Sequence, residues 1–297
     1  MTRISPLPLK AGVSASYLWL PQEQWDDMLV FLCARFPAVP ESAWRERMAR
    51  GEVVDSAGVM LVPQTPFRPG TCIFYYRAVD DEAEIPFEEH ILYRDDHLLV
   101  VDKPHFVPVT PTGRFLQQSL LVRLKRKTGL ADLTPMHRLD RETAGVILFS
   151  LNPASRGAYQ TMFQQRSMDK TYEALAGILV GRAFPFVHCS RLVDADKFFL
   201  MREAAGTPNS ETHVDLIEQR GDLGLYRLNP VTGRKHQLRV HMAALGVPIL
   251  NDQFYPDTVP AGSADNYDAP LKLLARSIAF TDPLSGDVRY FESLRKL

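Results

Sequence analysis

Residues 137–150 have the sequence HRLDRETAGVILFS, in which charged and polar side chains directly precede an apolar run. The run Val146–Phe149 is typical of a buried strand, and Gly145 stands at its entrance. A carboxylate beside a core strand is costly to remove from water unless a cation or several hydrogen-bond donors meet it. We therefore expect Asp140 to have a positively charged neighbour that comes from another part of the chain.

The overall composition is that of an ordinary globular protein. Of the 297 residues, 45% are hydrophobic and 23% are charged, and no apolar run is long enough to cross a membrane. A net charge of −1 argues against a protein that coats nucleic acid indiscriminately, although it is compatible with a local basic groove. Residues 1–16 lack the apolar core of a signal peptide, so we expect a cytoplasmic protein.

The sequence offers no sign of a metal or cofactor site. Cys33, Cys72 and Cys189 are far apart and lack Cys-x-x-Cys spacing, so we expect buried free thiols. The zinc motif His-Glu-x-x-His, the phosphate loop Gly-x-x-x-x-Gly-Lys, the turn Gly-x-Gly-x-x-Gly and the elbow Gly-x-Ser-x-Gly are all missing. His236 and His241 are five residues apart and would point in different directions from a helix, which makes them a poor metal pair.

The first eighty residues look like a small separate unit. Two helices and two strands are predicted in order, at Pro21–Phe36, Glu41–Arg50, Gly58–Val62 and Thr71–Arg77. The order resembles the small RNA-binding module named for the fourth small-subunit ribosomal protein, and the arginines of the second helix fit that resemblance. The alternative is that they form an ordinary solvated helix face. Residues 81–88 are acidic and contain proline, so we predict domains at 1–80 and 89–297 on either side of this linker.

The larger domain is predicted to be α+β, with a mixed, mostly antiparallel sheet and flanking helices. Many short strands are joined by tight turns, and few helices intervene. Helices are expected at 115–128, at 153–166 and after 232, and strands are expected at 91–93, 98–101, 146–149, 170–177, 211–217, 225–228, 273–280 and 288–292.

Three motifs in this domain resemble those of the RluA family of RNA pseudouridine synthases. They are HRLD at 137–140 with TAGV at 143–146, KTYEAL at 170–175 and GRKHQLRVH at 233–241. NDQFY at 251–255 and DPLSG at 282–286 extend the match over roughly residues 88–293. One four-residue match would be weak evidence, but three ordered motifs are strong evidence. The resemblance implies a synthase-like sheet with a central cleft.

The resemblance also implies a cofactor-free reaction on a uridine of ribosomal or transfer RNA. The bond from uracil nitrogen 1 to ribose is broken, the base rotates, and it is rejoined through carbon 5. Asp140 would be the essential carboxylate, acting either as a nucleophile at ribose carbon 1 or as a base at carbon 2. Arg239 would be the cation that keeps it ionised. Tyr172 would lie against the uracil ring and take the proton from carbon 5, and Arg138 would fill the gap left by the flipped uridine.

Five residues make up the predicted substrate-binding set, namely Arg138, His137, Arg234, Lys235 and His236. We expect His137 to act structurally by holding the catalytic loop with a hydrogen bond. Lys235 stands where the family usually has a small hydroxyl residue, so it adds a phosphate contact.

Each catalytic assignment has a plainer alternative. Asp140 and Arg239 could form a structural ion pair, Tyr172 could be a core aromatic residue, and Arg138 could be only a salt-bridge partner of Asp140. A non-catalytic RNA-binding or ribosome-assembly protein is the alternative function. A glycosidase would need a second catalytic acid, and no suitably placed one is apparent. We predict a monomeric, cytoplasmic RNA-uridine isomerase that holds RNA in a basic cleft.

Overall fold

The computed structural model describes residues 5–77, 82–197, 199–258 and 265–297. It divides the chain into two compact units. The N-terminal unit comprises Met1–Ala83, Pro111–Gln117 and Val122–Ala131, and the C-terminal unit comprises Glu84–Thr110, Gln118–Leu121 and Asp132–Leu297. Segments 111–117 and 122–131 therefore group with the N-terminal unit, although we predicted them within the larger domain. Residues 1–4 and 78–81 lie outside the described ranges, and the division at 81–88 stays a prediction.

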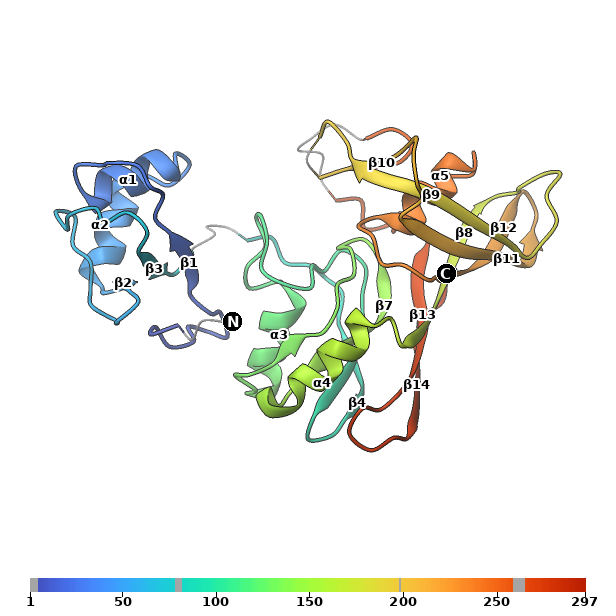
Figure 1. Ribbon diagram of the computed structural model, residues 1–297, viewed down its shortest axis with the longest axis horizontal. Helices are drawn as coiled ribbons and strands as arrows, with labels where there is room; N and C mark the ends of the chain where they lie inside the picture. Colours follow the sequence, from blue (N-terminus) through green and yellow to red (C-terminus); the bar gives the residue numbers. More distant parts are fainter. Residues whose placement is uncertain (1–4, 78–81, 198, 259–264) are drawn as a thin grey trace. The chain divides into compact units, whose positions relative to one another are not determined.

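Residues 5–77 of the N-terminal unit combine two short helices with a three-stranded antiparallel sheet (Figure 1). The sheet order is β1-β3-β2, and one apolar core lies between the helices and the sheet. The elements are β1 (Ser16–Trp19), α1 (Met28–Arg35), α2 (Glu41–Ala49), β2 (Val53–Asp55) and β3 (Cys72–Tyr75).

Two predictions for this unit were wrong in detail. Helix α1 begins at Met28 rather than at Pro21, because the Asp27 carboxylate caps it by accepting a hydrogen bond of 2.8 Å from the Val30 amide. The predicted strand at Gly58–Val62 is irregular and forms only an isolated bridge, between Met60 and Val54.

The arginines of α2 and Arg50, which caps its C-terminal end, are engaged within the N-terminal unit. Arg45 pairs with Glu41 at 2.7 Å, and Arg50 pairs with Glu52 at 3.0 Å. The buried Arg47 stacks over a tryptophan ring at 4.9 Å. These contacts favour the solvated, structural interpretation of the helix, and RNA binding by this unit stays a prediction.

An eleven-stranded mixed sheet forms the C-terminal unit (Figure 1). Its strand order is β10-β9-β11-β12-β8-β13-β7-β5-β4, with β14 paired to β13 and β6 paired to β7. Only β13 and β7 are parallel among the described strands, which confirms the mixed, mostly antiparallel α+β prediction. The bounds are β4 (His90–Arg94), β5 (Leu98–Lys103), β6 (Thr134–Pro135), β7 (Ala144–Ser150), β8 (Met168–Gly177), β9 (Phe186–Asp194), β10 (Met201–Ala204), β11 (Ser210–Arg220), β12 (Leu223–Pro230), β13 (Leu273–Thr281) and β14 (Val288–Glu292).

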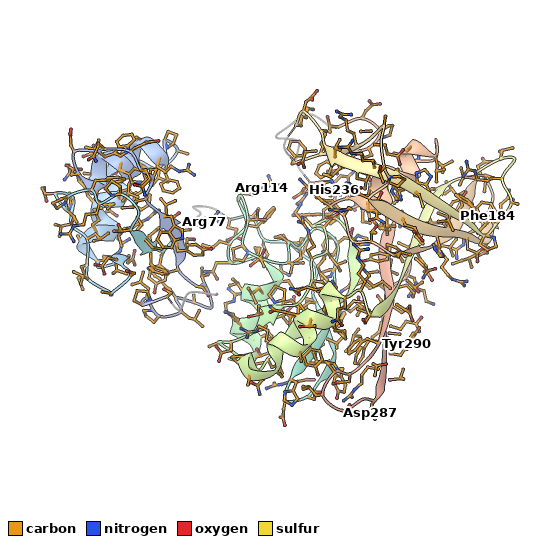
Figure 2. The ribbon with its side chains drawn as sticks, in the orientation of Figure 1. Arg77, Arg114, Phe184, His236, Asp287 and Tyr290 are labelled. Atoms are coloured by element: carbon orange, nitrogen blue, oxygen red, sulfur yellow. The ribbon has the colours of Figure 1, made fainter. Side chains whose placement is uncertain are left out.

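Three helices complete the described structure, namely α3 (Leu120–Thr128), α4 (Pro153–Gln164) and α5 (Gln237–Ala244). Helix α4 covers one half of the sheet, where Tyr159 packs into a core cluster with Leu148. Helix α5 covers the other half, where Leu238 and Met242 enter a second cluster. Figure 2 shows Phe184 near the β8–β9 turn and Tyr290 on the β13–β14 hairpin, and both lie away from His236 in this view. No helix within the described residues is long and apolar enough to span a membrane.

The two halves of the sheet meet where β7 approaches β13. Gly145 has φ +114°, and a Cβ atom at this position would lie 2.2 Å from the carbonyl oxygen of Ala275. Only glycine tolerates both this φ value and this contact. The close approach places the loop that carries Asp140 directly beside the central strand β13.

The cysteines are free thiols, but they are not all buried. Cys72 is buried, Cys33 is partly buried and Cys189 is exposed. The prediction was wrong for Cys189, because this residue lies on the solvent-facing side of β9.

Candidate active site

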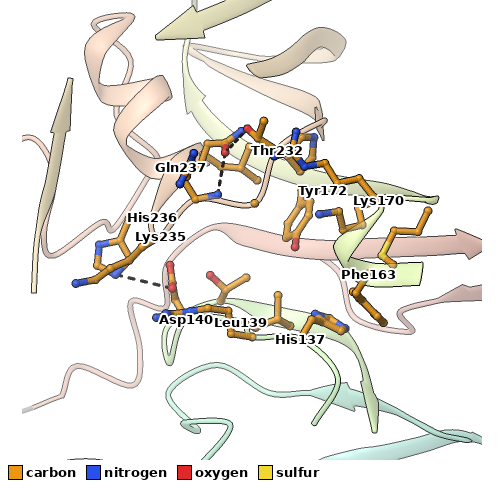
Figure 3. A pocket seen from close by; sticks show the side chains of 18 of the residues that line it. His137, Leu139, Asp140, Phe163, Lys170, Tyr172, Thr232, Lys235, His236 and Gln237 are labelled. Carbon is orange, nitrogen blue, oxygen red and sulfur yellow. Dashed lines mark hydrogen bonds and ion pairs between the residues drawn. The ribbon is translucent and has the colours of Figure 1, made fainter. Parts of the chain in front are cut away.

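A cleft of about 650 Å³ in the C-terminal unit gathers residues from all three sequence motifs (Figure 3). Its walls come from residues 136–143, the end of α4, strand β8 and the loop 232–236 that leads into α5. All eight residues predicted for the site line it: Asp140, Tyr172, Arg239, Arg138, His137, Arg234, Lys235 and His236. The fold therefore brings together residues that are far apart in the sequence.

Asp140 faces the cleft between two basic groups. Its Oδ2 atom is 3.6 Å from Nη1 of Arg239, and its Oδ1 atom is 3.8 Å from Nε2 of His236 (Figure 3). The Asp140 side chain is 15% exposed, whereas that of Arg239 is 1% exposed. The structure thus provides the cationic neighbour that Asp140 requires and leaves the carboxylate accessible to a ligand.

Arg239 is held mainly by residues that the sequence analysis did not single out. Asp252 accepts hydrogen bonds of 2.8 Å from Nε and 2.6 Å from Nη2, and Glu142 accepts one of 3.3 Å from Nη1. Burial by itself lowers the pKa of Arg239. The hydrogen bonds and charge of Asp252, together with the charges of Asp140 and Glu142, outweigh this effect, so the pKa of Arg239 is raised above its ordinary value. The pairing with Asp140 is therefore the loosest of three contacts, and Asp252 is the main partner.

Glu142 links Arg239 to a second ion pair. Its Oε1 atom accepts a hydrogen bond of 3.0 Å from Arg141, whose guanidinium also makes a bidentate pair with Asp265 at 2.8 and 2.9 Å. Burial raises the pKa of Glu142, but the charges of Arg239 and Arg141 lower it by more. Glu142 lies within the stretch quoted at 137–150 and Asp252 within NDQFY at 251–255, so the need of a buried arginine for a two-oxygen partner could have pointed to them.

Tyr172 projects from β8 into the cleft across from Asp140. Figure 3 shows its hydroxyl directed toward the segment that carries Leu139 and Asp140. Burial, and then the charge of Asp140, raise the pKa of Tyr172 well above its ordinary value. The hydroxyl therefore stays protonated at neutral pH.

His236 ends the loop that closes one side of the cleft. It caps α5 with a left-handed backbone at φ 54°, so the helix begins at Gln237 rather than at the start of the motif. Its Nδ1 atom is hydrogen-bonded to the hydroxyl of Tyr255 at 2.8 Å. Burial lowers the pKa of His236, and the nearby Asp140 offsets part of this effect. The loop itself is fixed by Gln237, whose side-chain carbonyl accepts hydrogen bonds from the Thr232 hydroxyl and the Arg234 amide.

His137 has the structural contact that we expected. The amide of Leu148 donates a hydrogen bond of 3.1 Å to its Nε2 atom, and its ring stacks on Phe163 at 5.0 Å. Burial, and then the charge of Lys170, lower the pKa of His137 to about 4. The ring is therefore neutral, with its proton on Nδ1. A substrate contact for His137 stays a prediction.

Positive charge dominates the lining of the cleft. Arg138 is exposed and forms no ion pair with Asp140 in the described structure, so the plainer interpretation of Arg138 was wrong. The guanidinium of Arg234 donates a hydrogen bond of 3.2 Å to the carbonyl of Asn209. Of the lining residues, one carries a carboxylate, Asp140, and six are cationic: Arg138, Arg166, Lys170, Arg234, Lys235 and Arg239.

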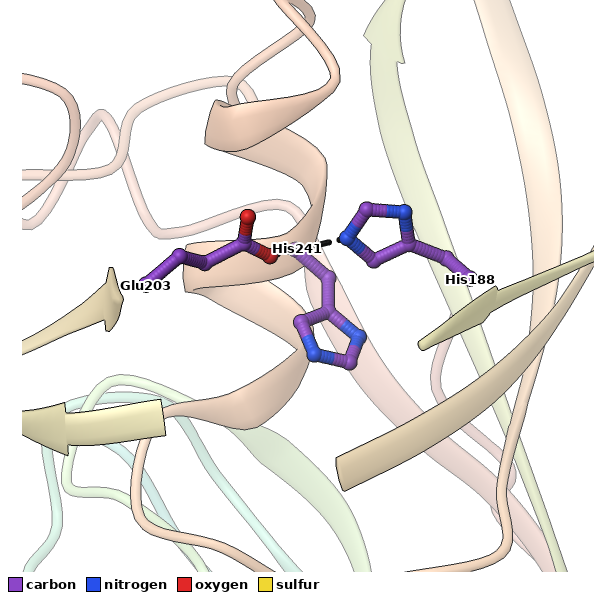
Figure 4. Close-up of side chains that lie close together, drawn as sticks. All are labelled: His188, Glu203 and His241. Atoms are coloured by element: carbon purple, nitrogen blue, oxygen red, sulfur yellow. Dashed lines mark hydrogen bonds and ion pairs between the residues drawn. The ribbon is translucent and has the colours of Figure 1, made fainter. Parts of the chain in front are cut away.

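A group of possible metal ligands lies outside this cleft, on β9, β10 and α5 (Figure 4). Nε2 of His188 is 2.8 Å from Oε1 of Glu203, and the ring of His241 contacts the ring of His188. Both ring nitrogens of His241 are already hydrogen-bonded at 2.9 Å, Nδ1 to Thr212 and Nε2 to Ser210. Burial, and then the charge of His188, lower the pKa of His241 to about 4. A structural polar cluster explains these contacts without a metal.

Comparisons with known proteins agree with the geometry. The profile of the RNA pseudouridylate synthase family matches residues 97–244. The dual-specificity RNA pseudouridine synthase RluA of Haemophilus influenzae is 32% identical over 229 residues, which cover 71% of this chain and 96% of that protein. RluA of Escherichia coli K12 is 34% identical over 209 residues, which cover 68% of this chain and 91% of that protein.

The fold agrees as well. The structure of human RNA pseudouridylate synthase domain containing 1 superposes with a TM-score of 0.58 at 24% identity, covering 70% of this chain and 84% of that one. The chain therefore belongs to the RluA family of RNA pseudouridine synthases and is an RNA-uridine isomerase.

Proposed function

We propose that this isomerase acts on a uridine of ribosomal or transfer RNA and that Asp140 is the group that reacts with the ribose. One observation carries the assignment of Asp140. It is the single carboxylate among the residues that line a cleft with six cationic residues, and a buried arginine lies beside it. A phosphate backbone is attracted to such a lining, while the ribose can meet the one anionic group.

The reaction rearranges bonds within one nucleotide. The bond from uracil nitrogen 1 to ribose carbon 1 breaks, and a bond from carbon 5 to ribose carbon 1 forms. Carbon 5 loses one proton and nitrogen 1 gains one, so no oxidant or reductant is consumed. Asp140 serves either as the nucleophile at carbon 1 or as the base at carbon 2, and both routes use an accessible carboxylate.

Arg239 acts by positioning and charge rather than by proton transfer. It is 1% exposed and bound in two places by Asp252, so its orientation is set before the substrate arrives. A fixed cation of this kind stabilises the carboxylate at a defined place in the cleft without reorganisation during the reaction.

Tyr172 orients the base. Its raised pKa means that the phenol, rather than the phenolate, faces the uracil at neutral pH. A neutral hydroxyl can accept the proton from carbon 5 only as it passes its own proton on. We therefore assign Tyr172 to holding the ring and relaying the proton.

Arg138 and the lysine of the third motif contact RNA. The Arg138 side chain is exposed at the cleft, which suits an arginine that enters the space left by the flipped base. Lys235 lies on the loop beside His236, where it can meet a phosphate.

We further propose that the protein works as a monomer in the cytoplasm. All eight residues predicted for the site line one cleft within the C-terminal unit, which supports this proposal. Sedimentation equilibrium at assay concentrations tests the monomer, and a dimer that alone carries activity would contradict it.

Release of tritium from carbon 5 of uracil tests the proposed substrate. The assay uses ribosomal and transfer RNA fractions labelled at carbon 5, with wild type and Asp140→Asn compared in each. We expect release by the wild type in one fraction and none by Asp140→Asn. Binding of both RNA fractions without release from either would contradict the assignment to these RNA classes.

A further inference from the structure

The cleft has a second end, beyond Tyr172, that the roles assigned above do not use. We call it the α4 end. Figure 3 shows Lys170 and Phe163 there, at the opposite end from Asp140 and His236. It is lined by Gln160, Phe163, Gln164, Arg166, Met168 and Lys170.

Lys170 is the central charge of the α4 end. Its side chain is partly buried, and it makes no ion pair or side-chain hydrogen bond with any described residue. Burial, and then the charge of Arg166, lower the pKa of Lys170. A partly buried ammonium beside a second cation is destabilised until an anion joins it. The local electrostatics therefore favour binding of an anion at this point.

The position of Lys170 relative to Tyr172 suggests which anion. The two residues are two apart on β8 and lie on the same face of the strand, so their Cα atoms are separated by about 6.8 Å. Tyr172 is assigned to the target uracil. Lys170 lies two residues from Tyr172 along the strand, a separation similar to that between adjacent nucleotides. The charged group of the adjacent nucleotide is its phosphodiester.

The rest of the α4 end suits a nucleobase. Phe163 offers a partly buried aromatic ring, already stacked on His137 at 5.0 Å and 21°. Gln160 and Gln164 are one helical turn apart, so they share a face of α4, and both line the cleft. Neither amide has a hydrogen-bond partner among the described residues. Aromatic rings bind base faces, and side-chain amides bind base edges.

We infer that the α4 end binds the nucleotide next to the target uridine, with Lys170 and Arg166 on its phosphodiester and its base against Phe163, within reach of Gln160 and Gln164. This site rests on the proposed function, because the target uridine must occupy the Asp140 end. It would make the identity of the flanking base part of substrate selection.

The phosphate contact is tested with Lys170→Met, which removes the charge and keeps the chain length. The substrate is the RNA fraction from which the wild type releases tritium. We expect KM to rise about tenfold with kcat nearly unchanged. We also expect the slope of log K against log salt concentration to fall in magnitude by about 0.7 to 1, the value for one lost phosphate contact. Lys170→Arg should restore both values, and Lys296→Met, an exposed lysine outside the cleft, should change neither.

The base contact is tested with the double variant Gln160→Ala and Gln164→Ala. Oligoribonucleotides from the active fraction are made with each of the four bases beside the target. We expect the wild type to prefer one base in kcat/KM and the double variant to lose most of that preference without a change in salt slope. Gln165→Ala, an exposed residue of the same helix end that does not line the cleft, should keep the preference.

The outcomes separate this site from the function on which it rests. If the wild type releases no tritium from any RNA, the proposed function fails. If the wild type is active but Lys170→Met matches Lys296→Met in KM and salt slope, the inferred site is wrong. A fall in kcat with KM and salt slope unchanged would also overturn it, because Lys170 would then serve the chemistry. Thermal unfolding of each variant shows whether any effect comes from loss of fold.

Discussion

The two ends of the cleft treat positive charge in opposite ways. At the Asp140 end, Arg239 is 1% exposed and is bound by Asp252 and Glu142. At the α4 end, Lys170 is partly buried, Arg166 is exposed, and neither has an ion pair among the described residues. Buried charges need partners to be tolerated, and once paired they fix geometry. Unpaired charges near the surface remain available to bind a charged ligand. The difference separates the part of the cleft that is built for the reaction from the part that is built for RNA.

Loss of the reacting carboxylate should have the largest effect on activity. Asp140→Asn should lower the rate of tritium release by about 10⁴-fold or more, because an amide is neither a nucleophile nor a base. RNA binding and folding should remain, since Arg239 keeps Asp252 and Glu142 as partners. Single-turnover kinetics measure the loss of rate, and an RNA-binding assay measures the retained affinity. Asp169→Asn, an exposed change of the same type outside the cleft, is the control and should retain full activity.

Breaking the buried pair should have the next largest effect, and it should act on stability. Asp252→Ala leaves Arg239 buried without its main partner, so we expect a loss of about 3–5 kcal/mol in the free energy of unfolding. Urea denaturation measures it. The matched control is Asp215→Ala, which breaks an exposed pair with Arg227 at 3.5 Å and should cost about 1 kcal/mol or less. Equal losses in the two variants would show that the buried pair of Arg239 contributes no more to stability than an exposed pair does.

The sequence predicted the residues of the cleft better than it predicted their contacts. Asp140 could be placed because a carboxylate beside the strand at 146–149 demands a cation, and the ordered motifs supplied one in Arg239. The main partner of Arg239 is Asp252, and the sequence could not distinguish it from several other acidic residues. That choice depends on how the segment after α5 folds back. The α4 end was missed for a similar reason. The spacing of Gln160 and Gln164 is visible in the sequence, but the rotation of the helix toward the cleft is not.

The fold was also predicted unevenly. Strands with a continuous or alternating apolar pattern, such as β7 and β12, were confirmed. Strand β9 was missed, because its inward-facing positions include His188 and Ser190. Ser190 is buried against His241, a contact that no local pattern reveals. Polar residues that satisfy one another inside a sheet interrupt the hydrophobic periodicity on which strand prediction depends.

Acid should weaken the support behind the Asp140 end. His241 is bonded to Thr212, and Thr212 accepts a hydrogen bond from Gln237, which fixes the loop that carries His236. The pKa of His241 is lowered from 6.5 to about 4, so the unfolded chain binds more protons between these pH values. Stability should therefore fall as pH drops from about 6.5 to 4, by about 3 kcal/mol for this group at about 1.4 kcal/mol per pKa unit.

Urea denaturation across this pH range measures the effect. His241→Gln should be less stable near neutral pH but should lose less stability on acidification than the wild type. An unchanged pH dependence in His241→Gln would show that His241 does not carry the effect. His105 and His137, whose pKa values are also lowered to about 4, and His236, whose pKa is lowered by burial, should contribute to the dependence that remains.

The smallest effect should come from an unpaired charge at the surface of the cleft. Arg138→Met removes an exposed guanidinium without an ion pair, so the free energy of unfolding should change by less than about 0.5 kcal/mol. Activity should still fall about tenfold, through KM, because the arginine is expected to replace contacts that the flipped uridine leaves behind. Arg94→Met, an exposed arginine outside the cleft, should change neither quantity. A large loss of stability in Arg138→Met would place Arg138 with the paired cations. A loss of RNA binding alone would show that exposed cations without a partner in the cleft are the ones that bind RNA.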